Sequence, residues 1–204
     1  MKEERRFFKE IFNKNSVAYP PQNIQLGGCR PLVEENEIEH IFSEELSWII
    51  DKTLRKNVVT VWKAASDRGG WESLDMVPFT LLFENSGKLT DHTKRMTNLA
   101  KAVYDQREED INLDYLIAGA LLHDVGKLLE YKVVDGKVVK SAYGKRFRHP
   151  VSGALLAQEL GLPEEIVLII YAHSHEGEKC ERTAESYIVH YCDFIDFRIR
   201  KSLV

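Results

Sequence analysis

Residues 113–127 read LDYLIAGALLHDVGK, and this stretch decides the fold. From Leu113 to Leu122 the run is almost wholly apolar, which predicts a helix that is buried at the centre of the protein. A polar pair, His123 and Asp124, follows directly on the apolar run. Because side chains from several elements can converge at helix ends, we expect this pair to lie in a functional site.

Apolar residues that recur at steps of three and four predict further helices on both sides of the central one. The predicted helices cover residues 34–55, 57–66, 90–103, 150–160, 163–173 and about 182–199. Two short β-branched runs flank Asp135-Gly136, a pair typical of tight turns, and predict a hairpin over residues 131–139. The expected fold class is therefore all-α: a helical bundle with a small β-hairpin insertion near residues 131–139.

Length and composition indicate one compact unit with an extension. The chain has 204 residues, of which 44% are hydrophobic and 29% charged. Residues 1–15 show a helical pattern, and residues 67–88 show no clear period. We expect an N-terminal helical extension over residues 1–80, packed on a main domain over residues 81–204 that carries the site.

The charge balance narrows the classes of partner. A formal net charge of -4 and a pI near 6.0 make nucleic acid an unlikely partner, because its phosphate backbone is normally met by a broad basic field. No apolar run is long enough for a signal peptide or a membrane span, and three cysteines without a CxxC spacing fit reduced thiols. These features predict a cytoplasmic protein that does not contact membranes. They do not indicate an oligomeric state.

Five of the seven histidines fall between residues 92 and 175, mostly at predicted helix ends, and suggest a metal site. They are His92, His123, His149, His173 and His175. Imidazoles together with carboxylates suit borderline transition metals, whereas an all-oxygen set would indicate Mg or Ca. A carboxylate directly after a histidine is also suited to bridging two ions.

The sequence around this pair resembles a known family. LLHDVGK at residues 121–127 is similar to the hallmark motif of the HD superfamily, in which the His-Asp pair is often followed by x-Gly-Lys. HTKRM at residues 92–96 resembles the upstream H-x-x-R segment, and Tyr191-Cys192-Asp193 resembles the downstream segment with the final Asp. The resemblance covers roughly residues 85–200 and implies a helical, metal-dependent hydrolase.

The resemblance also implies a ligand set. Four ligands, sufficient for a single-metal HD site, map by motif onto His92, His123, Asp124 and Asp193. The two further histidines, His149 and His173, resemble the added ligands of branches with dinuclear centres. We therefore expect a divalent transition metal, with two ions of Fe, Mn, Co, Ni or Zn, and Mg as an alternative.

Some positions have competing interpretations. Asp196 lies one helical turn after Asp193 and competes with it for the role of final ligand. His149 could instead stack on Pro150, and His173 could instead cap its helix through the dipole. We assign both histidines to the metal.

Catalysis and substrate binding are expected near the His-Asp pair. Asp124 and Lys127 are predicted to act in catalysis, since Lys127 lies three residues after Asp124 and close enough to meet a phosphate. The residues predicted to bind substrate are Arg95, Lys127, Arg146, Arg148 and His175.

The function expected from this set is hydrolysis of a phosphate ester, such as a nucleotide or a related phosphorylated metabolite, by metal-activated water. Two alternatives stay open: a diiron oxygenase with the same ligands, and a non-catalytic HD module that senses a nucleotide. The hairpin and the RHPVSGA segment at residues 148–154 also resemble HD domains of some exoribonucleases, although residues 1–80 do not resemble a nucleic-acid-binding barrel.

Overall fold

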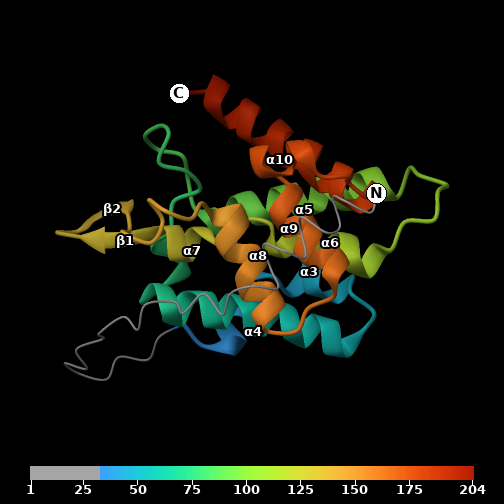
Figure 1. The fold of residues 1–204 in the computed structure, drawn as a ribbon, viewed down its shortest axis with the longest axis horizontal. Coiled ribbons are helices and arrows are strands. Elements are labelled where there is room, and N and C mark those ends of the chain that lie inside the picture. Colours follow the sequence, from blue (N-terminus) through green and yellow to red (C-terminus); the bar gives the residue numbers. More distant parts are fainter. Residues whose placement is uncertain (1–32) are drawn as a thin grey trace.

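The structure is a computed structural model that describes residues 33–204. The helix predicted over residues 1–15 lies outside this range. Helices form most of the described chain, and one small antiparallel hairpin completes it (Figure 1). The helices are α2 (Glu35–Ile41), α3 (Ser43–Ser47), α4 (Lys52–Gly69), α5 (Leu89–Tyr104), α6 (Leu113–Leu122), α7 (Lys127–Glu130), α8 (His149–Glu159), α9 (Glu164–Ala172) and α10 (Ala184–Ser202), and the strands are β1 (Tyr131–Val134) and β2 (Lys137–Lys140).

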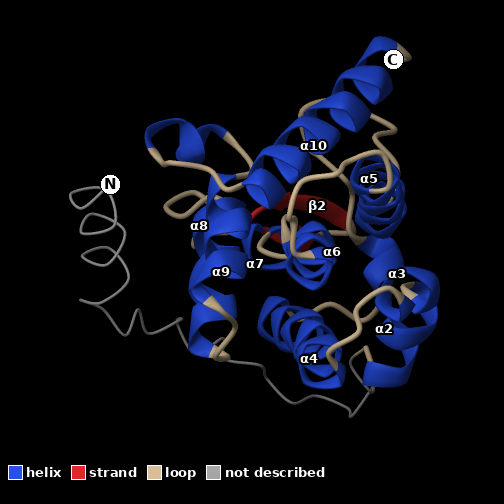
Figure 2. Cartoon of the chain, turned by 90° about the vertical axis from the view of Figure 1, so that its right-hand side faces the viewer, coloured by secondary structure: helices blue, strands red, loops and turns tan. Residues whose placement is uncertain are grey.

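Helix α6 lies at the centre of the bundle, as the apolar run predicts. It contacts α4, α5, α9 and α10, which surround it (Figure 2). Asn112 caps its first turn by accepting a hydrogen bond from the amide of Tyr115 at 3.0 Å. Every residue from Leu116 to Leu122 is buried. The His-Asp pair therefore follows directly on a helical stretch of seven buried residues.

The N-terminal helices differ from the prediction. Residues 34–55 do not form one helix, and the short helix expected at residues 57–66 is part of the longer α4. The chain breaks before α4 because the carboxylate of Asp114, on α6, accepts hydrogen bonds from the amides of Ile50 and Asp51 at 2.7 and 2.8 Å. Asp51 then caps α4 through the amides of Thr53 and Leu54.

Two tryptophans join the N-terminal helices to the chain around the His-Asp pair. Trp62 donates its indole N–H to the carbonyl of Leu121 at 3.0 Å, and Trp71 donates to the carbonyl of Leu128 at 2.8 Å. Both indoles are fully buried in a core that residues 33–77 and 117–171 build together. The domain boundary expected at residue 80 stays a prediction. Residues on both sides of it share one hydrophobic core.

The hairpin forms as predicted, with Tyr131 opposite Lys140 and Val134 opposite Lys137. Both turn residues have positive φ, 50° at Asp135 and 72° at Gly136, as a type I′ turn requires. Helices α5, α8, α9 and α10 also match their predicted ranges to within a few residues.

The segment between α4 and α5 had no predicted structure. It contains a short 3-10 helix (Leu74–Met76) and a single bridge between Pro78 and Lys88. The guanidinium of Arg200, on α10, donates to the carbonyls of Asn85 and Ser86 at 3.3 and 3.2 Å. This segment is therefore held against α10.

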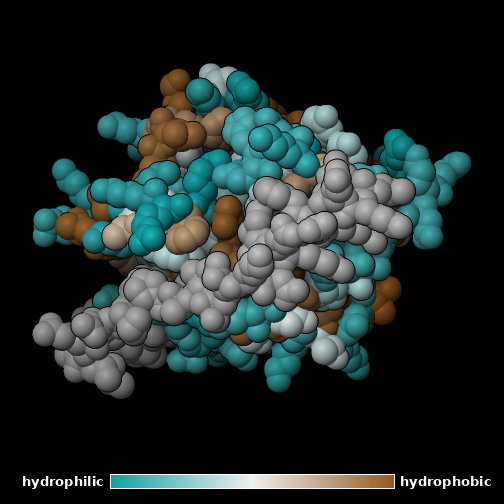
Figure 3. All heavy atoms as spheres, in the orientation of Figure 1, coloured by the Kyte–Doolittle hydropathy of each residue, from teal (hydrophilic) through white to brown (hydrophobic). Residues whose placement is uncertain are grey.

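The surface of the described residues is mainly hydrophilic on the face seen in Figure 3. Apolar surface gathers near the C-terminal end of α10, where Leu203 and Val204 are exposed. Among residues 33–204, none of the helices combines the length and the apolar character needed to cross a membrane.

Candidate metal centre

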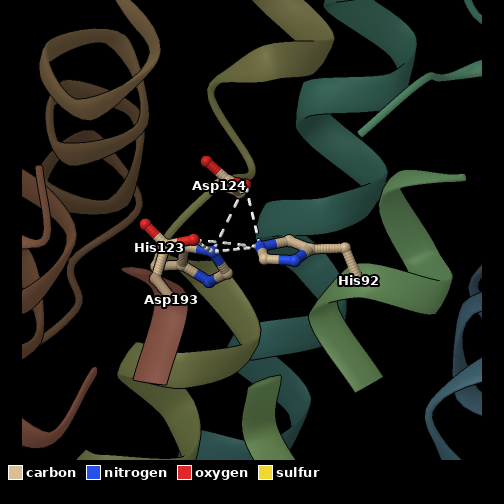
Figure 4. Close-up of side chains that lie close together, drawn as sticks. All are labelled: His92, His123, Asp124 and Asp193. Carbon is tan, nitrogen blue, oxygen red and sulfur yellow. Dashed lines mark hydrogen bonds and ion pairs between the residues drawn. The ribbon is translucent and has the colours of Figure 1, made fainter. Parts of the chain in front are cut away.

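Four of the predicted ligands meet at the end of α6. His92 comes from α5, Asp193 from α10, and His123 and Asp124 from the turn after α6 (Figure 4). The Nε2 atoms of His92 and His123 lie 3.2 Å apart and face the Oδ2 atom of Asp124 at 3.4 and 3.3 Å. Asp193 closes the group, with its Oδ1 atom 3.2 Å from His92 Nε2. One ion could be held by all four side chains.

A second group of ligands shares Asp124. His149 is the first residue of α8 and His173 follows the last residue of α9. Their Nε2 atoms face the other carboxylate oxygen of Asp124, Oδ1, at 3.2 and 3.6 Å. Each oxygen of Asp124 thus points to a different set of imidazoles, which is the arrangement of a bridging carboxylate.

Backbone carbonyls fix the orientation of two of the imidazoles. His123 donates from Nδ1 to the carbonyl of Ala120 at 2.7 Å, and His173 donates from Nδ1 to the carbonyl of Ile170 at 2.6 Å. Both carbonyls belong to the last turns of helices, where they lack an amide partner within the helix. Because Nδ1 carries the proton, Nε2 is left to bind a cation.

Carboxylates orient the other two imidazoles. His92 Nδ1 donates to Asp196 at 2.6 Å, and His149 Nδ1 donates to Glu130 at 2.8 Å. Glu130 also accepts the backbone amide of His149 at 2.7 Å, so both the ring and the start of α8 are held by one carboxylate. All four Nε2 atoms consequently face inward, toward Asp124.

Each orienting carboxylate has its own cation. Arg95 pairs with Asp196 through two hydrogen bonds of 2.8 and 3.0 Å, and Lys140 pairs with Glu130 at 2.7 Å. Burial raises the pKa of Glu130, but its hydrogen bonds with His149 and Lys140 lower the pKa more, to about 2. Burial acts in the same way on Asp196, and the bonds from His92 and Arg95 hold its pKa well below the ordinary value. Both carboxylates are therefore ionised at neutral pH.

The site favours a positive charge at its centre. Burial lowers the pKa of His92, but hydrogen bonds with Asp124, Asp193 and Asp196 raise it more, to about 9. Burial raises the pKa of Asp193, while the bond with His92 and nearby imidazole charges lower it to about 2. Either a proton on His92 or a bound metal ion would supply the positive charge that these carboxylates favour. The inward Nε2 atoms and the ionised carboxylates fit a divalent metal.

Lys127 lies directly beside the ligands. Its ammonium pairs with Oδ2 of Asp124 at 2.5 Å and lies 4.6 Å from the ring centre of Phe79. Phe79 also stacks on His92, with ring centres 3.7 Å apart. A buried lysine next to a carboxylate ligand is placed to contact an anion that approaches the same site.

A cavity of about 330 Å³ opens on the centre. This volume is at the low end of the range for small-molecule pockets. Its walls include the ligand residues Asp124, His149 and Asp193 as well as Lys127. The cavity therefore gives one small ligand, or the end of a larger one, access to the candidate metal positions.

The residues predicted to bind substrate have different positions. Lys127, Arg148 and His175 line the cavity, with Arg148 paired to Glu176 at 2.7 Å. Arg95 faces Asp196, and neither Arg95 nor Arg146 lines the cavity. Roles for these two arginines in substrate binding stay predictions.

Sequence reasoning missed several residues around the site. Asp196 appeared only as a rival of Asp193, yet the two carboxylates lie on opposite sides of the His92 ring. Glu130 gave no signal beyond its place at the end of an apolar run. Phe79 lies in the segment without periodicity, and the cavity-lining residues of α10 after Asp193 look like an ordinary helix end.

Comparison with known proteins agrees with this geometry. The HD domain family matches residues 89–197. A dihydroneopterin 2′,3′-cyclic phosphate phosphodiesterase of Methanocaldococcus jannaschii is 29% identical over 163 residues, which cover 74% of this chain and 66% of the relative. The 3′-5′ exoribonucleases YhaM of Bacillus subtilis and Bacillus pumilus are 33% and 29% identical, and the matches cover 54% of this chain and 38% of each relative.

The chain thus spans less than two thirds of each of these relatives. No solved structure matches it. The family match covers more than half of the chain and contains His92, His123, Asp124, His149, His173 and Asp193. The chain belongs to the HD domain family.

Proposed function

We propose that this protein is a metal-dependent phosphodiesterase that holds two divalent transition-metal ions. The observation that carries the proposal is the position of Asp124 between two groups of imidazoles. Each of its two carboxylate oxygens faces a separate pair of Nε2 atoms, at 3.2–3.6 Å. One ion would be held by His92, His123, Asp124 and Asp193, and the other by Asp124, His149 and His173. The imidazole-rich shell favours Fe, Mn, Co, Ni or Zn over Mg.

Divalent ions at these positions would lower the pKa of water toward neutrality and stabilise charge on phosphoryl oxygens. The residues of the chain would then position the phosphate. Lys127 lies 2.5 Å from Asp124 and lines the cavity, so its ammonium would contact a phosphoryl oxygen. Phe79 packs on His92 and shields this side of the ring from water.

The relatives support a phosphodiester rather than a phosphomonoester as substrate. One is named for hydrolysis of a 2′,3′-cyclic phosphate and two for exoribonuclease activity, and all three names describe cleavage of a phosphodiester. None of the three is named for an oxygenase reaction. We therefore place hydrolysis ahead of the diiron oxygenase.

The proposal is tested by metal depletion and reconstitution. Chelated protein should lose hydrolysis of bis(4-nitrophenyl) phosphate and adenosine 2′,3′-cyclic phosphate, and Mn²⁺, Fe²⁺, Co²⁺, Ni²⁺ or Zn²⁺ should restore it better than Mg²⁺. Elemental analysis should find two ions per chain. At 1,000-fold excess over its Kd each ion should add about 4 kcal/mol of stability, and raise the Tm by roughly 8 °C or more.

Turnover that survives complete chelation would contradict the proposal. Absence of turnover in protein that holds two irons, together with oxygen consumption, would favour the oxygenase instead.

The carboxylate that orients His92 offers a second prediction. Asp196→Asn removes the charge that fixes the ring, so we expect metal affinity to weaken by about 10- to 100-fold. The metal-free protein should also lose some stability, because Asp196 is only 12% exposed and pairs with both His92 and Arg95. Metal affinity is therefore compared at a temperature below the Tm of both proteins. Titration with Zn²⁺ in the presence of a competing chelator measures the affinity.

Asp105→Asn is the matched control, since Asp105 pairs with Lys101 on the surface of the same bundle and contacts no ligand. Equal metal affinity in both variants would show that Asp196 does not position His92.

A further inference from the structure

The last turns of α10 present an aromatic and basic face to the cavity. Phe194, Phe197, Arg198 and Lys201 all line it. Their spacing of three, four and seven residues places them on one side of the helix. Asp193, which begins this face, also lines the cavity. The same helix therefore carries a candidate metal ligand and, further along, two cations.

These two cations differ from the others that line the cavity. Lys127, Lys140 and Arg148 each pair with a carboxylate at 2.5–2.7 Å. Within residues 33–204, the exposed side chains of Arg198 and Lys201 form no ion pair or hydrogen bond. Their charge is consequently available to an external anion.

The positions of Arg198 and Lys201 on α10 indicate how far from the candidate metal centre a second anionic group would bind. With a rise of 1.5 Å per residue, Arg198 lies about 7.5 Å and Lys201 about 12 Å beyond Asp193 along the helix axis. The cavity of about 330 Å³ holds a ligand of limited size. A group attached to the reacting phosphate would therefore leave the centre along α10, past Phe194 and Phe197.

Interaction with the helix dipole does not by itself explain why basic and aromatic residues share this face of α10. Cations in the last turn of a helix interact favourably with its dipole, and Lys201 lies in that turn. Arg198 precedes the last turn, and the aromatic rings beside it face the same cavity. A combination of basic and aromatic side chains is typical of surfaces that bind phosphates joined to planar bases.

We propose that Arg198 and Lys201 bind a second phosphate of the substrate, at a distance from the phosphodiester that is cleaved. The inference rests on the proposed function, because it takes the phosphodiester to lie at the candidate metal centre. Phe194 and Phe197 would contact the planar ring between the two phosphates. The second phosphate could belong to a nucleotide chain or to a small doubly phosphorylated metabolite.

Two matched substrate pairs test the inference. Adenosine 2′,3′-cyclic phosphate is compared with its 5′-phosphorylated form, and the dinucleotide ApA with pApA. Both KM and the equilibrium Kd are measured for the full-length protein and for Arg198→Gln/Lys201→Gln, which keeps the apolar part of each side chain. The added phosphate should lower KM and Kd about tenfold in the unmodified protein in at least one pair. The double variant should lose this gain.

Lys52→Ala/Lys56→Ala is the charge-matched control, because both lysines are exposed on α4 and lie outside the cavity lining. The control should keep the tenfold gain. A gain only in the cyclic pair would assign the second phosphate to a small metabolite, and a gain only with pApA would assign it to a nucleotide chain.

The two proposals fail in different ways. Hydrolysis of the simple substrates with no effect of the added phosphate, or a gain that survives in the double variant, would overturn the second-phosphate site alone. A Kd gain that depends on Arg198 and Lys201, without hydrolysis of any substrate, would support the site and overturn the proposed function.

Discussion

Asp124→Asn is expected to lower kcat/KM for phosphodiesters by about a thousandfold or more. Asp124 is the residue shared by both candidate metal groups, and its side chain is 2% exposed. Replacing one carboxylate oxygen by an amide N–H removes the negative charge and places a donor against imidazole Nε2 atoms. Both ions should therefore bind more weakly, and elemental analysis should find less than one ion per chain.

Single histidine variants separate the two groups. His92→Ala should lose the ion held with Asp193, and His173→Ala the ion held with His149, so that each variant keeps about one ion. Loss of Asp124 also leaves Lys127 buried without its partner, so activities must be compared below the Tm of every variant. Two full ions and undiminished turnover in Asp124→Asn would refute the bridging role.

Gly126→Ala should destabilise the protein by about 3 kcal/mol. A Cβ atom at this position would lie 2.1 Å from the carbonyl oxygen of His149 and 2.7 Å from the amide of Gly153. Both are backbone atoms of α8, so the helix must move away from the turn that carries Asp124. Thermal denaturation should show a Tm lower by roughly 6–12 °C, and metal content should fall because His149 moves with the helix.

Two other glycines provide controls for this substitution. A Cβ at Gly153 would meet its nearest atoms at 3.1 Å, so its neighbours would have to move by only a few tenths of an ångström. Gly136 has nothing within 4 Å, but its φ of 72° makes alanine less favourable by about 1 kcal/mol. Equal Tm values for alanine at Gly126 and Gly153 would contradict the steric argument.

The central part of the fold could be predicted because its signals are local. The apolar run of α6 and the Asp135-Gly136 turn each determine their element without help from distant residues. The break between α3 and α4 could not be predicted in this way. It depends on Asp114, which lies 63 residues from Asp51 in sequence and accepts its amide. Sequence periodicity contains no information about such a contact.

In the candidate site, too, some residues could be predicted from local signals and others depend on distant contacts. The six predicted ligands lie together in the structure. They could be predicted because the order of the motifs and the positions of the helix ends both indicate them. The residues that orient them follow no such pattern. Asp196 shares a helix face with Asp193, and only the packing of α5 on α10 distinguishes their roles. Glu130 is recognised only when His149, 19 residues later, is seen to donate to it.

The pairing of the outer carboxylates with cations has a consequence for the electrostatic field of the site. Asp196 and Glu130 are neutralised by Arg95 and Lys140, so they add little net charge. The inner shell then contributes only the two negative charges of Asp124 and Asp193, because its four imidazoles are neutral when they bind metal. Two divalent ions would exceed this by two positive charges, and the ammonium of Lys127 beside Asp124 adds a third. The mouth of the cavity would attract anions from solution, although the protein as a whole is acidic.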